Sequence, residues 1–181
     1  MPAQTQTHLA RAPTSQVHVS PAGQAYSLTI NTLFRRPLFL DPDGARSVAR
    51  MQGEPSIWGS SRCLAWVLMP DRWHGLVVLG ADDSLDRLVR RFKSISARAV
   101  EPRFRINGWL WAKGFNERAL HSEENLLAVA RQLVGNPVRL GLAKSVGAYP
   151  YWNAVWLDSK RSQPAFVSDL LSCGPANTMS G

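Results

Sequence analysis

The feature that most constrains the fold is a pair of apolar runs separated by a short polar break, within residues 63–79. Cys63–Met69 and Gly75–Leu79 consist mainly of large and β-branched apolar residues. The break between them is Pro70-Asp71-Arg72-Trp73, and His74 begins the second run. Proline and aspartate interrupt regular structure, so the pattern predicts two strands at the centre of a sheet. A polar side chain at the mouth of a buried strand pair is held rigidly, which suits chemistry or binding.

The composition indicates one globular domain. The chain has 181 residues, of which 45% are hydrophobic and 19% charged, and this length is enough for a substantial core. No apolar run approaches the ~20 residues that a membrane helix needs. The N-terminal residues are polar, so we expect a cytoplasmic protein without membrane contact. We expect Cys63 in the core and Cys173 in a tail.

The charge of the chain indicates an anionic partner. The formal net charge is +8 and the sequence pI is about 10.3. Such a balance favours nucleic acid as the first candidate partner. The alternative interpretation is a basic protein that binds nothing specific.

Three regions are predicted along the chain. Residues 1–22 are rich in Thr, Gln, Ser, Pro and Ala without periodicity, which predicts a disordered or loosely attached arm. Residues 23–157 form the expected domain. Residues 158–181 are again rich in small and polar residues and are expected to form a tail.

The domain is predicted to begin with a strand and a short helix. Residues 24–34 alternate apolar and polar side chains, which is typical of a strand with one buried face. Asp41 or Asp43 can cap a helix over 43–52, and Pro55 would end it.

Residues 84–100 form a predicted basic helix, which Ser84 can cap. Its apolar residues recur at helical spacing on one face: Leu85, Leu88, Val89, Phe92, Ile95 and Ala99. The helix carries a single acid, Asp86, and five cations: Arg87, Arg90, Arg91, Lys93 and Arg98. The basic side is either an ordinary solvated surface or a surface that contacts phosphates, for which guanidinium groups are well suited.

Aromatic and basic residues alternate in the segment that follows. Trp109 and Trp111 precede Lys113, Phe115 and Arg118. Flat rings beside cations can stack on unpaired bases. Core packing of the tryptophans is at least as good an interpretation for each ring by itself.

A second amphipathic helix precedes an Asn-Pro pair. Leu126, Val129, Ala130 and Leu133 would form its buried stripe, and Gly135 with Asn136-Pro137 would end it. Gln132 lies four residues before Asn136, so a helix would place both side chains on one face.

Several of these motifs resemble the REP-associated tyrosine transposases, a family of single-tyrosine transposases. In that family a strand ending in proline is followed by a His-hydrophobic-His motif, which corresponds here to Arg72-Trp73-His74. The stretch Asn136-Pro137-Val138-Arg139-Leu140-Gly141-Leu142 is similar to the family's Asn-Pro-Val-(Arg/Lys)-x-Gly-Leu motif. Trp111-Ala112-Lys113-Gly114-Phe115 resembles its Trp-Gln-(Arg/Lys)-Gly-(Phe/Tyr) stretch. The resemblance spans residues 23–155.

The resemblance implies both a fold and a reaction. The fold is α+β, a ferredoxin-like antiparallel sheet with helices on one face, in the order strand, helix, strand, strand, helix, strand, helix. The family acts as a homodimer on single-stranded or hairpin DNA. A tyrosine attacks a phosphodiester to give a 5′-phosphotyrosine, assisted by a divalent metal such as Mg²⁺ or Mn²⁺. The metal ligands implied here are His74 and Asn136.

Two departures from the family fall on groups that this reaction requires. The nucleophile position is Gln132, whose amide is not a nucleophile, and the first metal histidine is Arg72, which has no lone pair to offer a cation. We therefore expect a DNA-binding protein that has lost strand cleavage, with no cofactor and a remnant site of Arg72, His74, Gln132 and Asn136. The expected DNA contacts are Arg72, Arg87, Arg90, Arg91, Lys93, Arg98, Lys113 and Arg118.

Two alternatives remain open at this stage. The first is an active transposase or nicking enzyme with a non-standard site, using one of the three tyrosines present, Tyr26, Tyr149 or Tyr151. The second is a protein-interaction domain whose interface is covered by tryptophans, namely Trp58, Trp73, Trp109 and Trp111.

Overall fold

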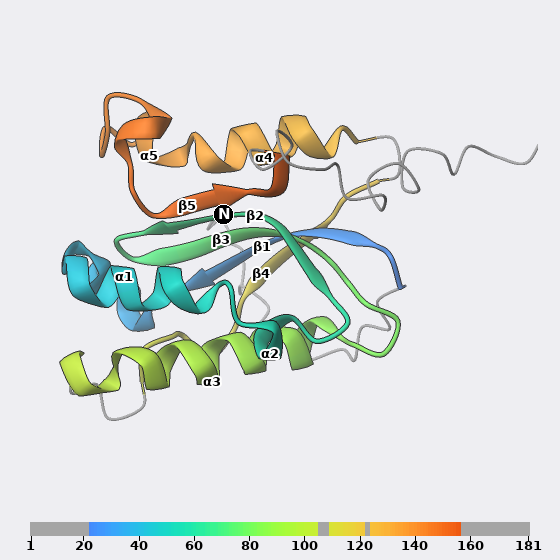
Figure 1. Cartoon of the computed structure of the whole chain (residues 1–181), viewed down its shortest axis with the longest axis horizontal. Helices are drawn as coiled ribbons and strands as arrows, with labels where there is room; N and C mark the ends of the chain where they lie inside the picture. The colour runs from blue at the N-terminus through green and yellow to red at the C-terminus, as the bar shows by residue number, and fades with distance from the viewer. Residues whose placement is uncertain (1–21, 105–108, 122–123, 157–181) are drawn as a thin grey trace, which may run out of the picture.

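The computed structural model describes residues 22–104, 109–121 and 124–156. Five strands form one antiparallel sheet in the order β4-β1-β3-β2-β5 (Figure 1). Their bounds are β1 Ala25–Asn31, β2 Arg62–Met69, β3 Arg72–Val78, β4 Asn116–Ala119 and β5 Trp152–Ala154. The predicted central strand pair is thus confirmed as the β2–β3 hairpin.

The hairpin turn follows from Pro70 and Asp71, which fall between paired residues Met69 and Arg72. On one side of β3, the indole of Trp73 lies over Gly75. A Cβ atom at Gly75 would lie 1.9 Å from the Cη2 atom of Trp73. Glycine at this position therefore lets the large ring pack against its own strand.

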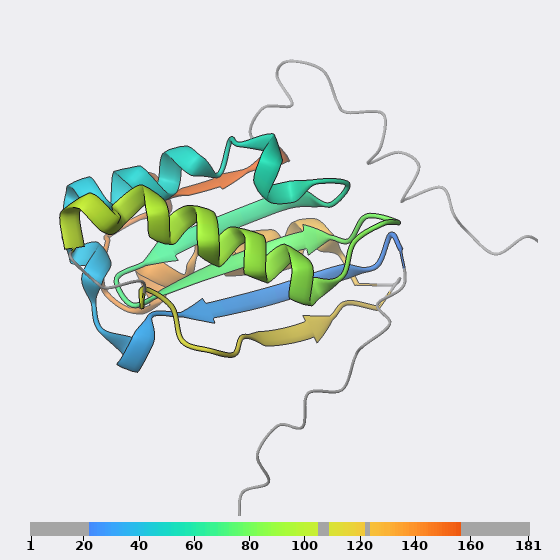
Figure 2. The same cartoon turned by 90° about the horizontal axis from the view of Figure 1, so that it is seen from below.

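Helices cover the sheet on both faces. The α-helices are α1 Pro42–Met51, α2 Pro55–Trp58, α3 Leu85–Phe104, α4 Leu126–Val134 and α5 Asn136–Arg139. Helices α1 and α3 lie side by side across one face, with β4 along the sheet edge (Figure 2). Helix α4 packs on the other face, against β2, β3 and β5 (Figure 1). The sheet faces are called below the α3 face and the α4 face.

The α+β, ferredoxin-like sheet agrees with the sequence prediction, and so does the order of the strands and main helices from β1 to α4. Strand β5, which follows them, was not predicted. The prediction of helices on one face holds for α1, α2 and α3, whereas α4 lies on the other. The reason lies in the central strands, which are apolar at successive positions and so offer two faces for burial. Val67, Met69 and Leu76 on the α4 face pack with Leu133 and Val134 of α4.

The core of the α3 face is aromatic. Trp73 and Phe92 have ring centroids 4.5 Å apart, and Phe92 and Trp111 are 5.7 Å apart. Trp73 is 1% exposed and Trp111 is 5% exposed. The hypothesis of an interface covered by four tryptophans is therefore wrong for these two rings, because they already fill the interior.

Local sequence signals account for the helix starts. The Asp41 carboxylate accepts a hydrogen bond from the Gly44 backbone N–H, at 2.8 Å, and caps α1. The Ser84 hydroxyl accepts one from the Arg87 N–H, at 3.3 Å, at the start of α3. Asn125 caps α4 in the same way through Ala128.

The 3₁₀ turns Leu33–Arg35, Leu38–Leu40 and Val146–Ala148 complete the described elements. The predicted arm, apart from Ala22, and the predicted tail lie outside the described residues. In the part of the chain that is described, no helix is both long and apolar enough to cross a lipid bilayer.

Candidate nucleic-acid interface

The candidate site begins at the first residues of β3. Side chains alternate along a strand, and Trp73 points into the core of the α3 face, so Arg72 and His74 belong to the α4 face. Thr29 of β1 and Val67 of β2 are the cross-strand neighbours of His74. His74 on the central strand β3 thus lies between strands β1 and β2.

His74 is a neutral, partly buried side chain. Its Nδ1 atom lies 2.8 Å from the Thr29 hydroxyl, at hydrogen-bond distance. Burial is the main cause that lowers the pKa of His74 to about 4, and the positive charge of Arg72 is the second contribution to that value. The imidazole therefore carries no charge at neutral pH.

Asp71 joins two arginines next to this histidine. The Nε–H groups of Arg35 and Arg72 donate to its two carboxylate oxygens, at 2.6 and 2.9 Å. Burial would raise the pKa of Asp71, but the hydrogen bonds from Arg35 and Arg72 and their charges outweigh it, so the pKa lies below its ordinary value. The carboxylate is thus an anion held between two cations.

The other two remnant residues are connected by Arg139. Helix α4 ends at Val134, and Gly135 leads directly into α5, which starts at Asn136. The Arg139 guanidinium donates to the backbone oxygen of Gln132, at 2.7 Å, and to the side-chain oxygen of Asn136. Arg139 also contributes to the low pKa of His74, so its charge acts on that imidazole.

Arg139 and Thr29 are two site residues that sequence reasoning missed. Arg139 stands in the Asn-Pro-Val-Arg stretch, and its role depends on the tight junction between α4 and α5. Thr29 stands opposite His74 through strand register. A polar residue alternating with the buried Leu28 and Ile30 was the available signal for Thr29.

The side chains around His74 do not fit a divalent metal. Mg²⁺ and Mn²⁺ prefer several oxygen ligands, yet the oxygen of Asn136 already accepts from Arg139. Three arginines, Arg72, Arg35 and Arg139, place positive charge on the His74 environment. No group of three His, Cys, Asp or Glu side chains capable of holding a metal ion occurs among the described residues.

Two of the three tyrosine hydroxyls donate to carbonyl oxygens, and the third tyrosine is buried in the core. Tyr149 donates to the Leu68 carbonyl at 2.7 Å, and burial raises the pKa of its hydroxyl to about 12. The Tyr151 hydroxyl donates to the Pro42 carbonyl at 3.3 Å. Tyr26 is 5% exposed and packs within the core of the α3 face.

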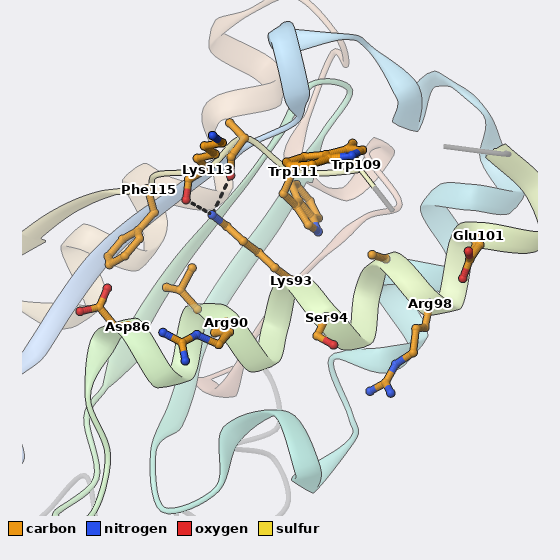
Figure 3. Close-up of a pocket in the computed structure, with 13 residues that line it drawn as sticks. Asp86, Arg90, Lys93, Ser94, Arg98, Glu101, Trp109, Trp111, Lys113 and Phe115 are labelled. Atoms are coloured by element: carbon orange, nitrogen blue, oxygen red, sulfur yellow. Dashed lines mark hydrogen bonds between the residues drawn. The ribbon is translucent and has the colours of Figure 1, made fainter. Parts of the chain in front are cut away.

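The basic helix α3 lies on the opposite face of the sheet and borders a groove of about 550 Å³. The groove runs between α3 and residues 109–115 (Figure 3). Arg90, Ser94 and Arg98 line it from the helix, and Trp109 and Lys113 line it from the facing segment. Trp109 is 55% exposed, so its ring is accessible there.

Lys93 spans this groove and holds the facing segment. Its ammonium group donates to the carbonyl oxygens of Ala112, Lys113 and Gly114, at 2.8, 3.2 and 2.9 Å (Figure 3). Burial lowers the pKa of Lys93. An ammonium with three protein acceptors has all its N–H groups occupied, so Lys93 is a structural cation in this arrangement.

The remaining predicted DNA contacts differ in their surroundings. Arg91 donates to the Asp83 carboxylate and to the Ile57 and Trp58 carbonyls, which ties α3 to α2. Arg87 is exposed, with one hydrogen bond of 3.2 Å to the Asp82 carbonyl.

Arg118 of β4 pairs with Ser27 of β1, which places it on the α4 face with Arg72. Its guanidinium makes two hydrogen bonds, of 2.9 and 2.8 Å, to the Glu124 carboxylate. The cations expected to contact DNA are thus divided between the two faces of the sheet.

Comparison with solved structures identifies the fold. One similar structure is that of a REP-associated tyrosine transposase bound to a REP hairpin, with a TM-score of 0.62 and 20% sequence identity, covering 82% of this chain and 87% of that chain. A candidate transposase from Deinococcus radiodurans gives a TM-score of 0.44 at 20% identity, covering 70% of this chain and 97% of that one. No protein-family model matches this chain, and no curated protein matches it either. At this identity, the first likeness shows that the chain has the fold of a REP-associated tyrosine transposase.

Proposed function

We propose that this chain is a DNA-binding protein of the tyrosine transposase type, which recognises single-stranded or hairpin DNA and has lost strand cleavage. The observation that carries the proposal is that Arg35 and Arg72 both donate to Asp71 at the start of β3, next to His74. The charges of Arg35, Arg72 and Arg139 all act on this neutral imidazole. The family to which the sequence is similar uses the corresponding positions to hold a cation. Here the same positions suit a phosphate, because guanidinium groups donate hydrogen bonds to its oxygens.

The absence of a suitable nucleophile supports the loss of cleavage. Gln132 occupies the position of the family's tyrosine, and its amide forms no phosphoester. The hydroxyls of Tyr149 and Tyr151 each donate a hydrogen bond to a carbonyl oxygen. The REP hairpin bound to the structural neighbour supports hairpin DNA as the substrate class.

Phosphate contact on the α4 face would come from Arg72, Arg118 and Arg139. Arg90, Arg98 and Lys113 offer a second contact surface on the α3 face, beside the exposed ring of Trp109. A strand of DNA that used both surfaces would cross the sheet edge formed by β4. We also propose the homodimer expected from the family, which light scattering of the purified protein would check.

The test is a binding titration with a fluorescently labelled DNA hairpin that carries a single-stranded extension. Binding is measured by fluorescence anisotropy at several salt concentrations. The expected affinity falls steeply with salt, with a log–log slope of about −0.7 per phosphate contact on single-stranded DNA. Arg72→Gln should weaken binding and flatten the slope. Arg50→Gln, which removes an exposed arginine from α1, is the matched control. It should change the affinity and the salt slope only by the small amount expected from the loss of one surface charge.

The loss of cleavage needs a separate measurement. The same hairpin is incubated with Mg²⁺ or Mn²⁺ and resolved under denaturing conditions. We expect neither a shortened strand nor a covalent protein–DNA adduct. Cleavage that His74→Asn abolishes would contradict the loss of activity, and salt-independent or absent DNA binding would contradict the proposed function as a whole.

A further inference from the structure

Phe34 is an exposed aromatic residue in an unfavourable backbone conformation. Its side chain is 85% exposed, and its φ and ψ are 55° and 23°. Arg35, which follows, has a φ of 56°. Among the described residues, these are the two non-glycine residues with positive φ. Left-handed geometry disfavours residues with a Cβ atom, and water disfavours an exposed phenyl ring, so neither feature serves stability.

The surrounding structure holds this turn firmly. Thr32 is fully buried, and its hydroxyl lies 2.8 Å from the Arg36 carbonyl oxygen and 2.9 Å from that of Asp71. The Thr32 N–H also donates to the Asp71 carbonyl, and the Leu33 N–H donates to that of Leu110, both at 2.9 Å. The turn is therefore fixed to the β2–β3 hairpin on one side and to the 109–111 segment on the other.

The same contacts connect Phe34 to the arginine cluster. Arg35, its neighbour in the chain, donates to the Asp71 carboxylate, which in turn accepts from Arg72. The charge of Arg35 also acts on His74. The exposed ring of Phe34 therefore belongs to the same turn as Arg35, whose guanidinium contacts the Asp71 carboxylate at the site proposed for a phosphate.

We propose that Phe34 is a platform on which an unpaired base of the bound DNA stacks, next to a phosphate held by Arg72. This inference rests on the proposed function and adds a base-contacting residue to it. An unpaired nucleotide fits the surroundings, because its base has a flat face for the ring and its phosphate complements the exposed Arg35 and Arg36. Stacking on aromatic rings beside cations is a general way to bind single strands.

The experiment compares two labelled DNA hairpins, one blunt and one with a single-stranded extension. Stacking of one base on an aromatic ring contributes about a tenfold gain in affinity. We therefore expect Phe34→Ala to weaken binding of the extended hairpin about tenfold and to leave the blunt hairpin unchanged. Phe34→Tyr, which keeps a flat ring, should restore the wild-type affinity, whereas Phe34→Leu should not.

A matched control and a direct readout complete the test. Leu40 is 66% exposed but has no ring, so Leu40→Ala should leave both affinities unchanged. The base analogue 2-aminopurine, placed in turn at each position of the extension, should report stacking by a fluorescence change at one position in wild type. Phe34→Ala should abolish that change.

Each outcome has a distinct meaning. Equal affinity of wild type and Phe34→Ala for the extended hairpin would overturn the stacking inference and leave the proposed function intact. Equal weakening of both hairpins by Phe34→Ala would also overturn it, because the ring would then act on duplex DNA or on the fold. If wild type bound neither hairpin, the proposed function itself would fail. Circular dichroism of each variant checks that it is folded.

Discussion

The two faces of the sheet use the same strand for different purposes. On the α3 face, Trp73 of β3 is enclosed by aromatic rings and by helices α1, α2 and α3. On the α4 face, Arg72 and His74 of that strand meet polar and charged groups. Helix α4 packs there on β2, β3 and β5. Both faces bury apolar side chains, but on the α4 face charged and polar groups lie close together at the start of β3, beside the apolar cluster formed with α4.

The largest effect is expected from the aromatic core. Trp73→Ala should lower the free energy of unfolding by about 3–5 kcal/mol, because it removes a fully buried ring from a packed site. Arg72→Gln, one position earlier on the other face, should change it by less than about 1 kcal/mol, since its ion pair with Asp71 is partly exposed. Urea denaturation measures both, and similar losses would contradict the division of roles between the faces.

A smaller effect is expected from the residue that accommodates this ring. Gly75→Ala should destabilise the protein by roughly 1–3 kcal/mol, because the new methyl group would overlap the Trp73 indole. Trp73→Phe combined with Gly75→Ala should recover part of that loss, because the smaller ring leaves room. Strictly additive effects in denaturant titrations would show that the two side chains do not meet.

On the α4 face, the low pKa of His74 should make the stability of the protein depend on pH. The pKa of His74 is about 4 in the folded protein and about 6.5 in the unfolded chain. Above pH 6.5 the histidine is neutral in both states. Between pH 6.5 and pH 4 the unfolded chain takes up the proton first. The free energy of unfolding therefore decreases by roughly 1–3 kcal/mol as the pH is lowered through this range.

His74→Asn keeps a polar group near Thr29 without a titratable ring, and the difference from wild type isolates the histidine from the carboxylates. The variant should lose stability less steeply than wild type between pH 6.5 and 4 in thermal unfolding. Identical pH profiles would mean that the pKa of His74 is the same in the folded protein as in the unfolded chain.

The smallest effect, and the sharpest contrast, is expected at Phe34. Phe34→Gly should raise the free energy of unfolding by about 1 kcal/mol, because glycine adopts a positive φ without strain. It should at the same time weaken binding of the extended hairpin. A lower melting temperature in this variant would show that the phenyl ring packs on the fold.

Sequence reasoning predicted the fold better than the site. The apolar runs around Pro70-Asp71 and the period of α3 depend on local burial patterns, which a single chain displays directly. Strand β5 was not predicted, because its three residues gain their place only by pairing with β2. The face covered by α4 likewise depends on contacts between distant segments.

The site was predicted in part, for a related reason. The positions Arg72, His74, Gln132 and Asn136 came from spacing and resemblance. Their hydrogen bonds could not be predicted in this way, because Arg139 reaches Asn136 only through the junction between α4 and α5. Helical periodicity also could not show that Arg91 and Lys93 are engaged by Asp83 and by loop carbonyls.

The carboxylate of Asp71 has a consequence for selectivity. It already neutralises part of the charge of Arg35 and Arg72. It therefore competes with any other anion for these two guanidinium groups. A solitary phosphate must displace it for little gain, whereas a polymer with many phosphates can engage other arginines first and outcompete it. Under the proposed function, the Asp71 carboxylate would therefore favour the binding of polymeric over small anions.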